Sequence, residues 1–258
     1  AQIAENAGVD RIFVDLETIG KKERQGGMDT VQSHHTLDDV ARIRKLIKKS
    51  ELLVRSNPVY SESATEINTI VKNGADIIML PYFKTVEEVK KFIDFVDGRT
   101  KTMLLFETPE SVEIADEILG LNGIDEVFIG LNDLSIGYGK KFMFELLADG
   151  TVEKLCLKFR LKGYSYGFGG IVAIGTGMVP AETILKEHYR LGSTSVILSR
   201  SFCNYERIGD INRINEIFTS GISCMRSFEK EIEIHSDYFN RNIKNLKDSV
   251  LRIVSSTV

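Results

Sequence analysis

The sequence is poor in cysteine and holds no long apolar run. Its three cysteines, Cys156, Cys203 and Cys224, are odd in number and unclustered, and none has the spacing of metal ligands. Such sparse cysteines are typical of reduced thiols in the cytoplasm. No apolar stretch approaches the ~18 residues of a membrane span, and the first residues, Ala1–Glu5, do not have the pattern of a signal peptide. We therefore expect a cytoplasmic protein with no membrane partner.

The sequence also lacks an excess of basic charge. The formal net charge is −4 at pH 7 and the pI is about 5.7, with no basic stripe, which argues against a nucleic-acid partner. The short run of Lys21 and Lys22 is predicted to be a solvated face. An apolar fraction of 43% is enough for a sizeable core, and 258 residues fit one large α/β barrel or two small domains.

Short apolar runs recur at steady intervals and predict seven strands. They lie at residues 11–15, 52–55, 76–80, 103–107, 127–131, 166–172 and 195–198. The segments between them have helical periodicity, and Thr85 with Glu88 forms a capping-box pattern. Glycines that suit a left-handed C-cap precede five of the strands, at positions 8, 74, 123, 163 and 192. This repetition predicts a parallel sheet built from βα units.

A closed (β/α)8 barrel needs eight strands, one more than the runs supply. The simplest interpretation is a TIM barrel whose first strand is missing from this sequence, and a seven-stranded open sheet is the alternative. We predict a barrel over residues 1–209. Residues 210–258 continue with helical spacing and predict a helical arm, packing either on the barrel or on a neighbouring subunit of a homo-oligomer.

Two carboxylates follow neighbouring predicted strands at the same kind of position. Glu107 ends the run 103–107, and Asp133 follows the run 127–131, 26 positions later. The carboxyl ends of parallel barrel strands are where such enzymes place their chemistry. Oxygen ligands that converge there suit a hard divalent cation such as Mg²⁺ or Mn²⁺.

Charged side chains end the first two predicted strands. Arg55 ends the run 52–55, and its planar guanidinium suits a substrate carboxylate, with a salt bridge to Asp15, Glu17 or Glu107 as the alternative. Period-2 alternation points Asp15 and Glu17 to the same side. There they could orient Arg55 or hold metal-bound water, or else be solvated at the surface.

A long loop after the first predicted strand contains two histidines. Residues 18–36 exceed the usual ~2–6 residues of such a connection, and loops of this kind are often functional. His34 or His35 could act as a general acid or base, or only cap or pack the next helix. Arg24 and Gln25 in the same loop could reach a substrate.

Outside that loop the remaining histidines and a glycine cluster have plainer predictions. His188 lies in an amphipathic pattern and is predicted to be packed, and His235 is predicted to be at the surface. Residues 166–171 (Tyr-Gly-Phe-Gly-Gly-Ile) lack the Lys-Ser/Thr of a phosphate-binding loop. We interpret these glycines as close approach of the backbone at the mouth of the barrel, where their exposed amides could also bind an anion.

Several segments together closely resemble the HpcH/HpaI aldolase and citrate lyase β-subunit family. The most specific are residues 107–110 (Glu-Thr-Pro-Glu) and 123–135, which include Gly-Leu-Asn-Asp-Leu. Residues 54–58, 74–81 and 15–17 agree in order and spacing. The resemblance covers roughly residues 1–205 and implies a TIM barrel of the phosphoenolpyruvate/pyruvate type.

The resemblance also implies a metal-dependent lyase that acts on 2-oxo acids or acyl-CoA esters. Carried over, Glu107 and Asp133 bind Mg²⁺ (or Mn²⁺ or Co²⁺), and Arg55 holds the substrate carboxylate or enolate oxygen. Cleavage of a small 2-oxo acid would pass through a metal-stabilised pyruvate enolate. The family often forms oligomers with swapped C-terminal helices, so we expect a homo-oligomer, a trimer or hexamer.

Further residues are assigned from the same motifs. Gly130, Leu131 and Asn132 would bind substrate beside the metal, and Glu17 would join Arg55 in the catalytic set. The chain departs from the aldolase branch, in which a histidine directly follows the early glutamate, because Thr18 stands there. We hypothesise that His34 or His35 substitutes for it.

Three functions stay open at this point. The first is a class II aldolase-like lyase, and the second is an acyl-CoA ester lyase of the citrate lyase β-subunit type. That branch usually carries Asp-Leu-Glu followed by Asp, which is absent here. The third is a barrel that binds metal and ligand without turnover.

Overall fold

The computed structural model describes residues 1–21, 34–234 and 237–256 of an α/β chain that folds as two units. The N-terminal unit comprises Ala1–Glu5 and Val9–Phe128, and the C-terminal unit comprises Asn6–Gly8 and Ile129–Val258. In the described residues no helix combines the length and apolarity needed to cross a bilayer. All three cysteines are free, as predicted.

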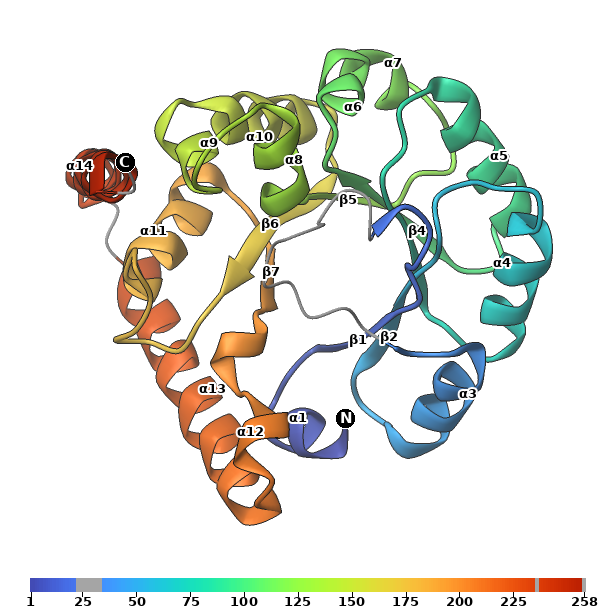
Figure 1. The fold of residues 1–258 in the computed structure, drawn as a ribbon, viewed down its shortest axis with the longest axis horizontal. Coiled ribbons are helices and arrows are strands. Elements are labelled where there is room, and N and C mark those ends of the chain that lie inside the picture. Colours follow the sequence, from blue (N-terminus) through green and yellow to red (C-terminus); the bar gives the residue numbers. More distant parts are fainter. Residues whose placement is uncertain (22–33, 235–236, 257–258) are drawn as a thin grey trace. The chain divides into compact units, whose positions relative to one another are not determined.

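The N-terminal unit repeats a strand followed by one or two helices. Its elements are α1 (Gln2–Asn6), β1 (Arg11–Asp15), α3 (Leu37–Leu46), β2 (Glu51–Arg55), α4 (Ser63–Lys72), β3 (Ile77–Leu80), α5 (Val86–Val96), β4 (Lys101–Phe106), α6 (Pro109–Glu113), α7 (Ala115–Ile118) and the start of β5 (Glu126–Ile129). Strands β1 to β5 follow one another in sequence order, and those from β1 to β4 are paired in parallel. Helices α3, α4 and α5 lie along the outer side of these strands (Figure 1).

Local sequence signals explain where these elements begin and end. The side chain of Thr85 accepts a hydrogen bond from the N–H of Glu88 and the Glu88 carboxylate accepts one in return, so the predicted capping box is confirmed. Thr108 caps α6 in the same manner with Ser111. Every residue of β3 is buried, as expected for a strand covered on both faces.

The C-terminal unit contains a shorter run of strands and more helices. Its elements are α8 (Leu131–Gly137), α9 (Glu145–Ala148), α10 (Thr151–Leu161), β6 (Ser165–Ile171), α11 (Ala181–Leu191), β7 (Ser195–Leu198), a 3₁₀ turn (Arg200–Phe202), α12 (Tyr205–Ile208), α13 (Ile211–Glu233) and α14 (Phe239–Ser256). Strands β6 and β7 pair in parallel. Helix α14, red in Figure 1, packs against α9 and α11.

The seven predicted strands are confirmed, β1 and β7 with the predicted bounds and the others with ends that differ by at most two residues. Strand β4 begins at Lys101 and ends at Phe106, so Glu107 is the first residue beyond it. Glycines 8, 74, 123, 163 and 192 all have positive φ, as the predicted C-caps require. A closed eight-stranded barrel stays a prediction, as does the boundary between a barrel at 1–209 and an arm at 210–258.

A buried polar network fixes α14 to α11. Glu187 is fully buried, and its Oε1 accepts a hydrogen bond of 2.7 Å from Nδ2 of Asn242 in α14. The same Nδ2 donates to the carbonyl of Thr183 at 3.1 Å. Arg190 Nε donates to the other carboxylate oxygen of Glu187 at 2.9 Å. A buried carboxylate is tolerated only when such partners are present.

His188 is packed in the same helix, as predicted. Its ring stacks on Phe168 of β6 with centroids 3.7 Å apart, and its Nδ1 lies 2.8 Å from Oγ of Ser193. Its Nε2 is buried without a hydrogen-bond partner in the described part of the chain. Burial disfavours the charged ring and lowers the pKa of His188 to about 3.

Replacing Asn242 by alanine is expected to destabilise the C-terminal unit. The change leaves Glu187 with an unsatisfied buried oxygen, so the free energy of unfolding should fall by about 1–3 kcal/mol. Urea denaturation measures the loss. Asn245→Ala on the exposed side of the same helix is the matched control. An equal effect of both substitutions would contradict the role given to the Glu187 network.

The buried His188 predicts a loss of stability in mild acid. Its folded pKa lies below the unfolded value of 6.5, so the stability is complete above pH 6.5 and declines below it, because only the unfolded chain takes up the proton. Between pH 6.5 and 5 the loss should be about 2 kcal/mol relative to His188→Gln, at ~1.4 kcal/mol per pH unit. Urea titrations of both proteins at each pH measure this difference, and parallel curves would show that His188 does not titrate on unfolding.

Candidate functional site

Arg55 and Asp15 meet at the carboxyl ends of β1 and β2. They are partners in the strand register, so their side chains leave adjacent positions. Arg55 Nε donates to Asp15 Oδ1 at 2.9 Å and Nη2 donates to Oδ2 at 2.8 Å, which is a bidentate pair. The guanidinium also lies over the ring of Phe13, 5.6 Å from its centroid. The salt bridge that the sequence left as an alternative is therefore present.

Glu17 and Lys21 complete a cluster with this pair. Glu17 Oε2 lies 3.3 Å from Arg55 Nη1 and 3.3 Å from Lys21 Nζ. Lys21 Nζ also donates to Asp15 Oδ2 at 2.8 Å. Both carboxylates thus face the same cations, which confirms that Asp15 and Glu17 point to one side. We call these four residues the strand-end cluster, and its formal charges sum to zero.

The burial of Lys21 corrects the prediction that it lies on a solvated face. Only 8% of its side chain is exposed. A lysine is buried when its ammonium finds carboxylate partners, and here Asp15 and Glu17 supply two. The signal available in the sequence was the spacing of four positions from Glu17, just after a strand end.

The cluster shifts the pKa of both members of its central pair. Burial alone would raise the pKa of Asp15, but the hydrogen bonds and charges of Arg55 and Lys21 outweigh it and hold that pKa well below its usual range. Burial would likewise lower the pKa of Arg55, and Asp15, Glu17 and Glu107 raise it instead. The stability that Asp15 contributes is present above its unfolded pKa of 3.8 and is lost in stronger acid.

A second network fixes the chain directly after Glu17. Oδ1 of Asn57 accepts hydrogen bonds from the backbone N–H groups of Thr18 and Ile19, at 2.9 and 3.0 Å. Glu66 Oε1 in turn accepts from both the backbone and the side-chain nitrogen of Asn57. The Thr18 hydroxyl also donates to Asn57 Oδ1 at 3.3 Å. Asn57 therefore has a structural role that explains its place in the Arg-Ser-Asn-Pro segment.

Glu107 is buried at the end of β4. Its Oε1 accepts a 3.0 Å hydrogen bond from the backbone N–H of Tyr82, which follows β3. Tyr82 has a φ of +49°, an uncommon conformation for a residue with a side chain, and such strain clusters at functional sites. The charge of Glu107 contributes to the raised pKa of Arg55. Glu107 therefore belongs electrostatically to the same region as the strand-end cluster.

The two loop histidines differ in their surroundings. His35 is half-buried, and its Nδ1 accepts a 3.1 Å hydrogen bond from the backbone N–H of Asp15. His34 is exposed. Arg24 and Gln25, together with His235, lie outside the described residues. Of the two loop histidines, both among the described residues, His35 is the one that hydrogen-bonds to the strand-end cluster, through the backbone of Asp15.

In the C-terminal unit, Asp133 lies in the first turn of α8. Its Oδ1 is 3.3 Å from Nδ2 of Asn132. Leu131 is buried and approaches Gly169 of β6 so closely that a Cβ at Gly169 would lie 2.7 Å from Leu131 Cδ1. Gly169 also has a φ of +60°. A close approach is therefore present at Gly169, where it involves the helix that carries Asp133, and its predicted place at the mouth of a barrel stays a prediction.

The donor chemistry of Glu107 and Asp133 fits a hard divalent cation. Each carboxylate follows a strand end, and oxygen ligands are those that Mg²⁺ prefers. Within residues 1–21, 34–234 and 237–256, no three His, Cys, Asp or Glu side chains gather as a metal cluster. Each of the two carboxylates, taken within its own unit, offers oxygen ligands of the kind that Mg²⁺ binds beside several waters.

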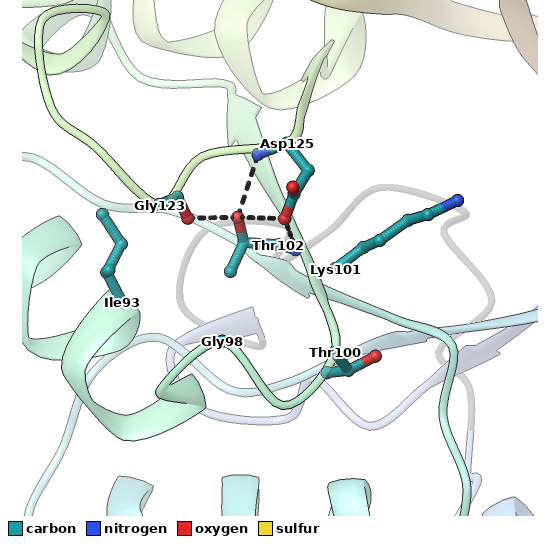
Figure 2. Close-up of a pocket in the computed structure, with 7 residues that line it drawn as sticks. All are labelled: Ile93, Gly98, Thr100, Lys101, Thr102, Gly123 and Asp125. Atoms are coloured by element: carbon teal, nitrogen blue, oxygen red, sulfur yellow. Dashed lines mark hydrogen bonds between the residues drawn. The ribbon is translucent and has the colours of Figure 1, made fainter.

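A hollow of about 360 Å³ lies at the opposite end of β4. Figure 2 shows the Thr102 hydroxyl between the carbonyl of Gly123 and the carboxylate of Asp125. Asp125 Oδ2 also accepts from the Thr102 backbone N–H at 2.7 Å. These bonds join the starts of β4 and β5, so the polar side chains here brace the strands.

Comparisons with known proteins agree with this architecture. A model of the HpcH/HpaI aldolase/citrate lyase family matches residues 1–145. Among curated proteins, none matches the chain. An HpcH/HpaI aldolase from Desulfitobacterium hafniense DCB-2 is similar in structure, with a TM-score of 0.61 and 18% identity over 83% of this chain and 87% of that one.

Two further solved structures have the same fold. An HpcH/HpaI aldolase/citrate lyase family protein from Burkholderia cenocepacia J2315 has a TM-score of 0.60 and 14% identity, over 82% of this chain and 89% of its own. The citrate synthase SbnG has a TM-score of 0.59 and 16% identity, over 83% and 88%.

Replacing Lys21 by methionine is expected to destabilise the N-terminal unit. The change leaves two buried carboxylates facing one cation, and the loss of a buried ionic partner costs about 3 kcal/mol. Urea denaturation at pH 7 measures it. Lys49→Met, at an exposed lysine, is the control. If Lys21→Met unfolds at the same urea concentration as the control, then Lys21 does not hold the strand-end cluster.

Proposed function

Because this chain belongs to the HpcH/HpaI aldolase/citrate lyase family, we propose that it is a divalent-metal-dependent carbon–carbon lyase acting on a small 2-oxo acid. Membership of the family supports an enzyme of the lyase type. The observation that carries the finer proposal is the Arg55–Asp15 pair at the ends of β1 and β2, within the electrostatic influence of the buried Glu107.

Arg55 is the proposed binding group for the substrate carboxylate. Asp15 occupies Nε and one N–H of Nη2, which holds the guanidinium plane in a fixed orientation. A guanidinium carries five N–H donors, so others remain for an anionic ligand. Glu17 and Lys21 keep the strand-end cluster neutral. A substrate carboxylate would bind the remaining N–H groups of Arg55, so it would add one negative charge and need not displace Asp15. Preorganised donors of this kind cost little to align when the substrate binds.

Glu107 and Asp133 are the proposed ligands of Mg²⁺, Mn²⁺ or Co²⁺. When bound there, the cation would polarise the carbonyl of a 2-oxo acid. The backbone N–H of Tyr82 holds one oxygen of Glu107 and so orients its carboxylate. Gly130, Leu131 and Asn132 would contact the substrate next to Asp133. Assembly as a homo-oligomer, a trimer or hexamer, is part of the same proposal.

An acyl-CoA ester lyase is the second candidate, because the family model includes citrate lyases. The hydrogen bonds of Thr18 bear on the choice between the aldolase-like lyase and the acyl-CoA ester lyase, because Thr18 stands where the aldolase branch has a histidine. Its N–H and hydroxyl both donate to Asn57, so it is engaged in holding the loop and does not replace the histidine of the aldolase branch. A barrel that binds metal and ligand without turnover is the third candidate.

Proton exchange at the methyl group of pyruvate tests the proposed function. In D₂O with Mn²⁺ or Mg²⁺, NMR should show exchange that depends on the metal, because enolisation of a 2-oxo acid releases a methyl proton. Glu107→Gln and Asp133→Asn should reduce the rate by at least about 100-fold, by analogy with the loss of one charge-stabilising group. Arg55→Lys should mainly raise the pyruvate concentration needed for half-maximal rate.

Glu110→Gln is the matched control, since it removes an exposed carboxylate three residues beyond Glu107. It should exchange at the wild-type rate. Metal binding without any exchange of pyruvate would contradict the 2-oxo-acid lyase and favour the acyl-CoA ester lyase or the silent barrel. Citryl-CoA or malyl-CoA cleavage assays would then separate those two.

A further inference from the structure

The backbone N–H of Asp15 determines which nitrogen of the His35 ring carries the proton. The carboxylate of Asp15 binds Arg55, and its N–H donates to Nδ1 of His35 at 3.1 Å. In the parallel pairing of β1 with β2, it is Leu16 N–H that donates to the carbonyl of Arg55. Alternate N–H groups point to opposite sides of a strand. The N–H of Asp15 therefore points away from β2, and His35 satisfies it.

The hydrogen bond fixes where the ring carries its proton. A nitrogen that accepts from a backbone N–H carries no proton itself, so the proton of the neutral imidazole is on Nε2. A charged ring would place an Nδ1–H group against the Asp15 N–H, donor against donor. His35 directly precedes Thr36, the N-cap of α3.

Asp39 of α3 has its own partners close to His35. Its pKa is lowered mainly by hydrogen bonds from Thr36. The backbone N–H and the hydroxyl of Thr36 both donate to Oδ2 of Asp39, each at 2.9 Å. Nη1 of Arg42 lies 3.3 Å from Oδ1, the other carboxylate oxygen of Asp39. The charge of Asp39 is therefore largely compensated by groups other than His35.

We propose that His35 acts as a neutral hydrogen-bond donor through Nε2–H to a substrate oxygen, and not as a general base. This role rests on the proposed 2-oxo-acid function. Nδ1 is engaged by Asp15, so the ring has no basic nitrogen available to accept a substrate proton. Its proton stays on Nε2 throughout. The Asp15 residue thus positions two donors for an anionic substrate, the guanidinium through its carboxylate and the imidazole through its backbone.

Two amide substitutions separate a donor from a base. In His35→Gln the amide nitrogen takes the place of Nε2, whereas in His35→Asn the amide oxygen takes the place of Nδ1. A donor role predicts that His35→Gln keeps pyruvate exchange within about fivefold of wild type and that His35→Asn loses more than about tenfold, the worth of a full hydrogen bond. A base cannot be replaced by either amide, and both would lose about 100-fold or more. Asp38→Asn, at an exposed residue three positions beyond His35, is the control.

The tautomer provides a readout that does not depend on activity. Long-range ¹H–¹⁵N NMR of the full chain labelled with ¹⁵N-histidine, with His35→Gln to assign the signal, should show His35 with Nε2–H near neutral pH. An Nδ1–H or doubly protonated ring, or equal losses in both amide variants, would overturn the donor role. Absence of exchange in the wild type would instead contradict the proposed function and remove the donor role with it, while the tautomer would still be observed.

Discussion

The pair between Arg55 and Asp15 is the interaction on which the rest of the candidate site depends. Two strands end opposite each other, and each ends on a side chain of opposite charge. Because both groups are buried, each needs the opposite charge of the other. Glu17 and Lys21 add one more anion and one more cation, so the cluster stays neutral. The result is a rigid, neutral cluster at the carboxyl ends of the strands. His35 binds the backbone of Asp15, and the charge of the buried Glu107 acts on Arg55.

The sequence predicts the framework well because the relevant forces are local. Apolar runs between turn residues define the strands. Thr85, three positions before Glu88, caps the N-terminus of α5. Arg55, Asp15 and Glu17 were recognisable because they end such runs. The spacing of Glu107 and Asp133 likewise follows from the length of one strand–helix unit, although their joint role in metal binding stays a prediction.

Features set by contacts distant in sequence were not predictable in the same way. The burial of Lys21 is a different case, because its partners Asp15 and Glu17 lie close to it in the sequence and the spacing of four positions from Glu17 was a usable signal. The choice of Arg55 between substrate and salt bridge depends on the register with β1. The positive φ of Tyr82 accompanies its hydrogen bond to Glu107, in a segment that has no glycine to signal it. The nitrogen of His35 that is engaged depends on which N–H of β1 points away from β2.

The contact between His35 and β1 has a consequence beyond the candidate site. A strand with unpaired N–H groups is a template for pairing with strands of other molecules, and proteins protect such edges with side chains or covering loops. By binding the N–H of Asp15, the imidazole covers the last donor of this strand on the side away from β2. The residue that we propose as a ligand contact therefore also gives this backbone donor of β1 a partner that is not a neighbouring strand.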